Sequence, residues 1–538
     1  MNTIYCFDCG SDLSGLGKIL FCPNCGVSFQ EADSSGSSYD TETPQMGGSS
    51  QGLEENQSVY FSEGILMTNI SRLSSKLYCY EAKVRDLLEN YINELSYRGH
   101  QYHLLDAGEI FHPTREYDIQ EYVKLLDDFH ITKNRKPRFL FIIGCNEIIP
   151  MASITNEPKC YYSDETIESD IAYSYLLSKN LEERIWSGAV FERSATFLTG
   201  RLPIPNVSDL NYLERYLNNS KQIIHEGIGA CTFFGLSAKS WEEASDETIR
   251  AIEAPKTVLT SPDYDLSTIH EVFDSKASFY YFNLHGSESP FQSEYFGDYD
   301  SVISPEQMST LERCNVVLSE ACYGAKFVEY DSGASMLLSA LSNKTVNFVG
   351  SSKVAFGSST DEISSADVIS KAFFDAITVG KSSGESFEFA RQVVFHESLE
   401  HLFDYSVTTA VEFNLFGDPF CAPTRSSSEI ELARFEGLKR SKPRKRMIYS
   451  DNASVSPLAQ VRGILDDTLS GIKDRLNEEL YQKTGVFPRC SSIFELITMN
   501  GQKSYNFVYE SQAQSGGLKL YSVFTDVNGH IQSILHSK

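Results

Sequence analysis

The chain has 538 residues, of which 41% are hydrophobic, and it carries a formal net charge of −27. This length exceeds what one compact core holds, so two to four folded domains are expected. The negative charge argues against general binding to nucleic acid and favours basic partners. No apolar run is long enough to cross a bilayer, and the first residues lack the pattern of a secretory signal. A cytoplasmic protein is therefore expected.

Four cysteines are grouped near the start of the chain. They form two Cys-x2-Cys pairs, Cys6 with Cys9 and Cys22 with Cys25, and a glycine follows each pair. Four thiolates in this arrangement are typical of a closed, structural zinc site. A segment of about 25 residues cannot fold by apolar burial alone, so bound zinc would supply the folding free energy. Residues 1–30 resemble a zinc ribbon, and their scarcity of basic residues favours a structural role or contact with a protein regulator.

Shifts in composition divide the remaining chain. Residues 31–57 are rich in Ser, Gly, Glu and Gln, which is typical of a flexible linker. Residues 58–425 alternate strand-like and helix-like patterns and are expected to form the main domain. Residues 426–452 form a basic linker, and residues 453–538 form a further small domain.

Apolar runs in the main domain alternate with helical patterns, which predicts a mostly parallel sheet covered by helices on both faces. A helix is predicted over residues 84–95, where apolar side chains recur on one face. The predicted strands are residues 138–144, 196–199, 230–235, 257–259, 279–284, 315–318 and 345–349, and further predicted helices are residues 209–221, 332–341 and 361–377.

Two of these strands end on side chains that are capable of catalysis. His285 and Gly286 follow the strand 279–284, and Cys322 follows the strand 315–318. Catalytic groups of open α/β sheets gather at the carboxyl ends of strands. A thiolate nucleophile needs an adjacent base, and histidine commonly provides it. The opposing interpretation is a structural role for each residue, because free cysteine is among the most often buried residue types.

Six short blocks resemble gingipain-like cysteine peptidases, a family of the caspase-like clan. In chain order they are FLFIIGCNEIIP (139–150), SDIAY (169–173), GRLP (200–203), FNLHGSE (282–288), EACYG (320–324) and FGDP (416–419). Cys145 stands where the family usually has aspartate, which leaves the role of that position open. The resemblance implies a caspase-like α/β fold and cysteine peptidase activity.

The resemblance also implies roles for particular residues. Cys322 would attack the scissile carbonyl, and His285 would manage the proton at the leaving amine. The backbone N–H groups of Gly286 and Cys322 would face the oxyanion. Asp170 would lie in the primary specificity pocket and pair with a substrate arginine, or it would be only a helix cap or a surface carboxylate. Glu320 either orients the site or merely ends a strand.

The residues after 453 predict one helix on a small antiparallel sheet. Residues 455–481 are expected to form one long helix, with an apolar stripe made of Val461, Leu465, Leu469, Ile472, Leu476 and Leu480. The predicted strands are 493–499, 504–510 and 518–525, with 531–535 as a fourth, and Asn-Gly pairs indicate two hairpin turns. Such a domain would recognise a partner or restrain the peptidase.

The basic linker holds six Lys and Arg residues within positions 438–447. It is either a solvated connection between domains or a site at which the peptidase cleaves its own chain, because extended linkers are preferred cleavage sites. A localisation or nucleic-acid signal fits poorly with the acidic chain.

The sequence therefore predicts a cysteine endopeptidase that cleaves protein substrates after arginine or lysine and needs no cofactor for catalysis. The alternative is a catalytically silent caspase-like scaffold that binds peptides, although a scaffold would not need both His285 and Cys322. A third hypothesis, a nucleic-acid-binding regulator, would predict binding that weakens steeply with salt.

Overall fold

The computed structural model describes most of the chain after residue 61. The described residues are 62–112, 115–133, 136–155, 166–227, 231–287, 293–313, 315–328, 330–331, 333–359, 363–397, 405–422, 455–460, 467–484, 489–497, 503–512 and 518–537. All of them belong to one compact unit, Phe61–Lys538. The predicted zinc cysteines and both predicted linkers lie outside the described residues.

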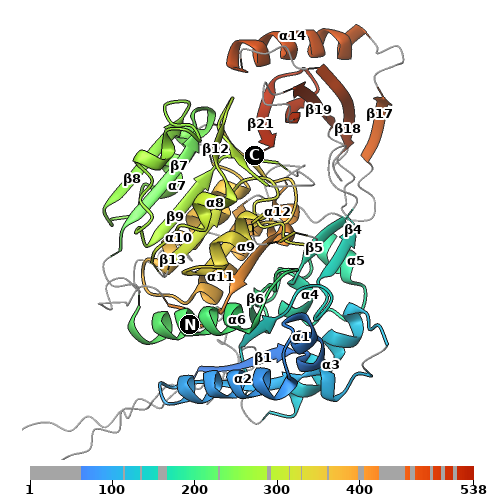
Figure 1. The fold of residues 1–538 in the computed structure, drawn as a ribbon. Helices are drawn as coiled ribbons and strands as arrows, with labels where there is room; N and C mark the ends of the chain where they lie inside the picture. Colours follow the sequence, from blue (N-terminus) through green and yellow to red (C-terminus); the bar gives the residue numbers. More distant parts are fainter. Residues whose placement is uncertain are drawn as a thin grey trace, which may run out of the picture. The chain divides into compact units, whose positions relative to one another are not determined.

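A ten-stranded sheet forms the centre of this unit (Figure 1). Its strands lie in the order β2-β1-β3-β6-β16-β14-β13-β9-β7-β8. Their bounds are β1 (Ser62–Thr68), β2 (His100–Asp106), β3 (Phe139–Ile143), β6 (Leu198–Leu202), β7 (Phe233–Ala238), β8 (Lys256–Ser261), β9 (Phe279–Asn283), β13 (Asn315–Ser319), β14 (Thr345–Ser351) and β16 (Phe413–Gly417).

Neighbouring strands of this sheet are parallel with one exception. β16 is parallel to β6 but antiparallel to β14. The sheet therefore consists of two parallel halves that run in opposite directions and meet at β16. The mostly parallel sheet was predicted correctly, but no strand was predicted for β1, β2 or β16. The predicted strands for β6 and β7 begin two and three residues too early.

Helices cover both faces of the sheet. They are α1 (Ile70–Lys76), α2 (Glu81–Ser96), α3 (Ile119–Ile131), α4 (Ile171–Ser174), α5 (Leu181–Trp186), α6 (Leu210–Glu226), α7 (Glu242–Ile249), α8 (Pro305–Met308), α9 (Met336–Leu341), α10 (Ala366–Ile377), α11 (Ser383–Glu397) and α12 (Ser406–Glu412). No described helix has the length and apolar character that crossing a bilayer requires.

The side chains of strand β9 are packed on both faces of the sheet. Its run Phe-Tyr-Tyr-Phe-Asn is fully buried, and successive side chains of a strand point to opposite faces. Tyr281 packs edge-on against Phe374 of α10, and Tyr280 packs against Phe273 on the other face. A continuous apolar run of this kind is typical of a parallel sheet buried between two helical layers.

The C-terminal module, defined here as residues 455–537, is a helix on an antiparallel sheet, as predicted. Its elements are β17 (Val455–Gln460), α14 (Asp467–Thr484), β18 (Arg489–Ile497), β19 (Lys503–Gln512), β20 (Leu518–Asp526) and β21 (Ile531–Ser537). The apolar stripe of α14 is buried at Leu469, Ile472, Leu476 and Leu480.

The prediction of one helix over residues 455–481 is wrong at its start. Residues 455–460 form β17, which pairs antiparallel with β18, and the helix begins only at Asp467. Pro457 lies at a shift in the strand register. Proline disfavours a helix interior and is tolerated at strand irregularities, so its presence fits the strand.

The C-terminal module is joined to the main domain by a short strand, β15 (Phe356–Gly357). β15 pairs antiparallel with β21. Phe356 stacks on Tyr405, with ring centroids 3.9 Å apart, and both pack in one apolar cluster with Phe524 and Leu535. The module thus extends its sheet onto a segment of the main domain.

Candidate active site

The carboxyl ends of β9 and β13 lie side by side at one edge of the sheet. The two strands are parallel, with Phe282 opposite Ser319. His285 is the second residue after β9, and Cys322 is the third residue after β13. The histidine and the cysteine singled out in the sequence therefore leave the sheet at neighbouring positions.

Gly286 lies directly against the backbone of Cys322. A Cβ added to Gly286 would come within 1.8 Å of the Cys322 carbonyl oxygen and 2.9 Å of its carbonyl carbon. Real Cβ atoms do not approach other atoms this closely, so only glycine fits at this position. The close approach brings the segment that carries the imidazole of His285 onto the residue that carries the thiol.

Two neighbours hold the His285 segment in place. His285 and Gly286 form β10, which pairs antiparallel with β11 (Tyr295–Phe296), and β11 pairs in turn with β12 (Ser301–Ile303). The imidazole of His285 packs against the indole of Trp241, with ring centroids 4.2 Å apart and the planes at 59°. Trp241 is fully buried at the start of α7, so this contact restricts the orientation of the imidazole.

The segment that follows β14 holds the turn around Cys322. The Cys322 thiol, which is 5% exposed, lies 3.5 Å from the carbonyl oxygen of Ala355 and donates to it. The backbone N–H of Tyr323 donates to the carbonyl oxygen of Lys353 at 2.8 Å. Tyr323 has a φ of 55°, a left-handed conformation that costs free energy in a residue with a side chain. This turn is therefore maintained by its surroundings.

Glu320 is a buried structural residue beside the turn that carries Cys322. Its Oε1 accepts a hydrogen bond of 2.8 Å from the Tyr281 hydroxyl, and its side chain is fully buried. Burial and then the nearby charge of Glu320 raise the pKa of Tyr281, so this hydroxyl remains a donor. Of the two roles considered for Glu320, these contacts support the structural one, in which it ties the end of β13 to β9.

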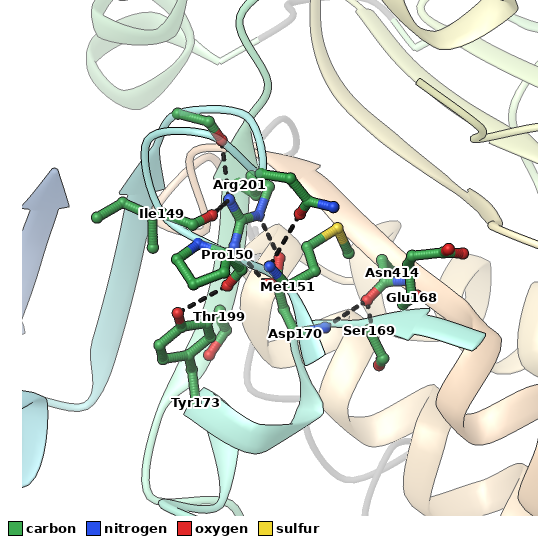
Figure 2. Close-up of polar contacts among 12 residues, drawn as sticks. Ile149, Pro150, Met151, Glu168, Ser169, Asp170, Tyr173, Thr199, Arg201 and Asn414 are labelled. Atoms are coloured by element: carbon green, nitrogen blue, oxygen red, sulfur yellow. Dashed lines mark hydrogen bonds and ion pairs between the residues drawn. The ribbon is translucent and has the colours of Figure 1, made fainter. Parts of the chain in front are cut away.

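Asp170 is paired with an arginine of the same chain. It follows β5 (Thr166–Ser169), which pairs with β4 (Ala152–Thr155). Arg201 Nε lies 2.8 Å from Asp170 Oδ2, and Arg201 Nη2 lies 2.6 Å from Asp170 Oδ1. Asp170 is 4% exposed and Arg201 is completely buried. Figure 2 shows the carboxylate and the guanidinium facing each other.

The surroundings of this ion pair satisfy its remaining polar groups. Arg201 Nη1 donates to the carbonyl oxygens of Gly144 and Ile149, each at 2.8 Å, and the backbone N–H of Asp170 donates to Asn414. A substrate arginine would have to displace a buried arginine to reach Asp170. This geometry argues against the predicted substrate-binding role of Asp170. Its side chain does not cap α4 either.

Cys145, which stands where the family usually has aspartate, lies in a buried turn held by backbone hydrogen bonds. Cys145 follows β3, is largely buried, and its carbonyl oxygen accepts hydrogen bonds from the N–H groups of Ile148 and Ile149. Burial raises the pKa of its thiol, which favours the unreactive protonated form.

A metal site is not apparent in the described part of the chain. Among those residues, no group of three or more His, Cys, Asp or Glu side chains could hold a metal ion. The four cysteines predicted to bind zinc lie outside it.

Sequence reasoning missed Trp241 and the segment 353–355. Trp241 belongs to no recognisable motif, but one signal was present. It follows β7, the strand that pairs parallel with β9, so it leaves the sheet at the same edge as His285. The segment 353–355 follows β14, which is the other neighbour of β13.

A mostly parallel sheet covered on both faces, with histidine and cysteine at the ends of adjacent strands, is the arrangement expected of a cysteine peptidase. The profile of peptidase family C25 matches residues 75–423, which is more than half of the chain. The chain belongs to peptidase family C25. The match stops before the C-terminal module.

Similar solved structures include two of the same peptidase. The crystal structure of the Arg-specific cysteine proteinase gingipain R is 10% identical, with a TM-score of 0.48, and the match covers 90% of this chain and 99% of that chain. A complex of the pro- and mature domains of Porphyromonas gingivalis RgpB is 12% identical, with a TM-score of 0.48 and coverage of 88% and 99%. A further protease structure is 10% identical, with a TM-score of 0.49 and coverage of 88% and 97%. No curated protein matches the chain.

Proposed function

We propose that the protein is an endopeptidase in which Cys322 and His285 form the catalytic pair, and that it cleaves protein substrates after a basic residue. The contact between Gly286 and the Cys322 carbonyl group is the observation that carries this proposal, because it joins the two catalytic segments. The net charge of −27 supports the preference for basic substrates, which it would attract.

The proposed chemistry is acyl transfer through a thioester. His285 accepts the thiol proton, and the Cys322 sulfur attacks the scissile carbonyl carbon. The N–H groups of Gly286 and Cys322 stabilise the oxyanion. The C–N bond breaks as His285 gives the proton to the leaving amine, and water then hydrolyses the thioester and restores the thiol.

Hydrolysis of short fluorogenic peptides that end in arginine or lysine tests the catalytic pair. Cys322→Ala and His285→Ala should each lower kcat/KM by at least about a thousandfold, because both residues act in the bond-breaking steps. Cys79→Ala is the matched control, because Cys79 is a partly exposed free thiol in another part of the fold. Its activity should equal that of the wild type.

A covalent probe distinguishes the enzyme from the scaffold. A peptide chloromethyl ketone with a C-terminal arginine should alkylate Cys322 and no other cysteine, with loss of chloride, so the protein gains the mass of the reagent less hydrogen chloride. Peptide binding without hydrolysis or labelling in the wild type would instead support the catalytically silent scaffold.

We also propose that Cys6, Cys9, Cys22 and Cys25 bind one structural zinc ion. Their spacing supports tetrahedral thiolate coordination, which holds zinc without an open position for substrate. Elemental analysis of the full chain should find about one zinc per molecule. Cys6→Ser combined with Cys9→Ser should remove the zinc and leave cleavage of short peptides unchanged, whereas retention of zinc in that variant would contradict the assignment.

A further inference from the structure

We propose that Glu168 selects the basic side chain of the substrate and that Lys353 neutralises its carboxylate until substrate binds. The inference rests on the proposed function and names the residue that would contact the side chain before the cut bond. Glu168 lies on β5, two residues before Asp170.

Among the described residues near this ion pair, Glu168 offers a carboxylate that a ligand can reach. Its side chain is 27% exposed, whereas that of Asp170 is 6% exposed and paired with Arg201. The flanking residues Ile167 and Ser169 are fully buried, as the alternation of a strand requires. Figure 2 shows the Glu168 carboxylate directed away from the ion pair of Asp170 and Arg201.

The backbone of Glu168 is fixed to the strands beside the nucleophile. Its carbonyl oxygen accepts hydrogen bonds from Ser352 Oγ at 2.9 Å and from Asn414 Nδ2 at 3.2 Å. Ser352 directly follows β14, and Asn414 lies in β16, which pairs with β14. The backbone that carries the Glu168 side chain is therefore held in place before any ligand arrives.

Lys353 connects this carboxylate with the nucleophile turn. Its Nζ lies 3.1 Å from Glu168 Oε2, and its carbonyl oxygen accepts the N–H of Tyr323, the residue after Cys322. One residue thus contacts both the candidate specificity group and the turn that carries the nucleophile.

The exchange of Lys353 for a substrate arginine is favourable on physical grounds. An arginine donates two parallel hydrogen bonds to a carboxylate, which is a stronger contact than a single lysine contact. The opposite arrangement, an acidic side chain on Lys353, is disfavoured because Lys353 is only 13% exposed and the acidic chain repels anions.

Paired peptides that differ only in charge test this inference. Citrulline has the shape of arginine without its charge. Glu168→Gln should lower kcat/KM for the arginine peptide by about tenfold to a hundredfold, because one charge-assisted contact is lost. Cleavage of the citrulline peptide should change by less than about threefold, since that peptide never made the contact. An unchanged ratio of the two rates would overturn the proposal.

Glu147→Gln is the matched control for this charge change. Glu147 pairs with Lys76 at 2.6 Å on the surface and is 70% exposed. Its removal changes the net charge equally and should leave the ratio of arginine to citrulline cleavage unchanged. Glu168→Asp keeps the charge and should retain most of the preference, which provides a test should the Gln variant not fold.

Lys353→Met distinguishes a basic substrate side chain bound to Glu168 from an acidic one bound to Lys353. Removal of the competing cation should raise kcat/KM for the arginine peptide. Faster cleavage of a glutamate peptide than of the arginine peptide by the wild type, with loss of that preference in Lys353→Met, would overturn the proposal.

Binding to the Cys322→Ala variant tests the specificity independently of catalysis. A fluorescently labelled arginine peptide should bind at least about tenfold more weakly when Glu168→Gln is added, and the citrulline peptide should not. This result would support the role of Glu168 even if the wild type hydrolysed no peptide. Equal binding of both peptides would overturn it even if Cys322 proved to be the nucleophile.

Discussion

Asp170 and Arg201 neutralise each other within the protein, and loss of one charge would leave the other buried without compensation. We expect Asp170→Asn to lower the free energy of unfolding by about 3–5 kcal/mol, as measured by denaturant titration. Cleavage of arginine and citrulline peptides should fall by the same factor, because the pair would support the fold rather than contact the substrate.

Asp209→Asn serves as the control for that measurement. Asp209 caps α6 by accepting the N–H of Tyr212, and asparagine is an equally good capping residue. The change in unfolding free energy should stay below about 0.5 kcal/mol. A selective loss of arginine cleavage in Asp170→Asn would contradict the structural role of Asp170.

Trp241 is fully buried and packs against the imidazole of His285, so we regard it as a positioning residue. Trp241→Leu should lower kcat by about tenfold to a hundredfold with little change in KM, because a misplaced catalytic group is costly. Trp241→Phe keeps an aromatic ring at this position and should restore most of the rate. If Trp241→Leu and Trp241→Phe lost the same fraction of kcat and the same number of degrees in melting temperature, Trp241 would act only in packing.

The residues of the site differ in how far the sequence predicts them. His285 and Cys322 end recognisable strands and lie in family motifs. The ion pair of Glu168 and Lys353 depends on how β5 meets the segment after β14, which no local pattern encodes. The sequence motif of Asp170 does not show that Arg201 faces it, so the pairing that argues against a substrate-binding role is visible only in the structure.

At the scale of elements, the junction of β10 with the turn that carries Cys322 depends on one glycine. Gly286→Ala would place a methyl group 1.8 Å from the Cys322 carbonyl oxygen, and the backbone would have to move. We expect kcat/KM to fall by at least about a hundredfold while the circular dichroism spectrum stays unchanged.

Gly333→Ala is the matched control for Gly286→Ala. A Cβ on Gly333 would meet no atom within 4 Å, so this variant should retain full activity. Similar activity in the two alanine variants would show that the contact between Gly286 and Cys322 is not needed for catalysis.

Strands were easiest to predict where burial on two faces makes the sequence uniformly apolar, as in β9. β2, with the sequence HQYHLLD, pairs only with β1 in the main sheet and mixes polar with apolar residues, so its pattern is ambiguous. β17 was mistaken for helix because its apolar residues continue the stripe of α14. Its pairing with β18 decides its conformation, and this pairing is tertiary information.

At the scale of the whole molecule, Asp418 connects elements that are distant in the sequence. Its Oδ1 accepts hydrogen bonds from the Tyr102 hydroxyl at 2.6 Å and from the N–H of Phe420 at 2.8 Å, and its Oδ2 accepts from the Tyr91 hydroxyl. Tyr91 lies on α2 and Tyr102 on β2, so this carboxyl group links the end of β16 to the first part of the domain.

The stability of the protein should therefore depend on pH through Asp418. Burial raises the pKa of this carboxyl group from 3.8 to about 6 in the folded protein. The folded state consequently binds more protons than the unfolded state between these values, and the contribution of Asp418 to stability falls as the pH rises from about 4 to about 6.

Comparison with Asp418→Asn isolates this contribution from other titrating groups. The unfolding free energy of the wild type minus that of the variant should decrease over this interval and level off above it. A difference that increased with pH would contradict the raised pKa.

The pairing of β15 with β21 has a practical consequence. β15 begins one residue after Ala355, whose carbonyl oxygen accepts a hydrogen bond from the thiol of Cys322. An affinity tag or fluorescent label fused directly behind β21 would therefore be tethered near the sulfur of Cys322. Rates recorded on such a fusion would mix the behaviour of the enzyme with steric interference from its attachment, so purification handles belong elsewhere in the molecule.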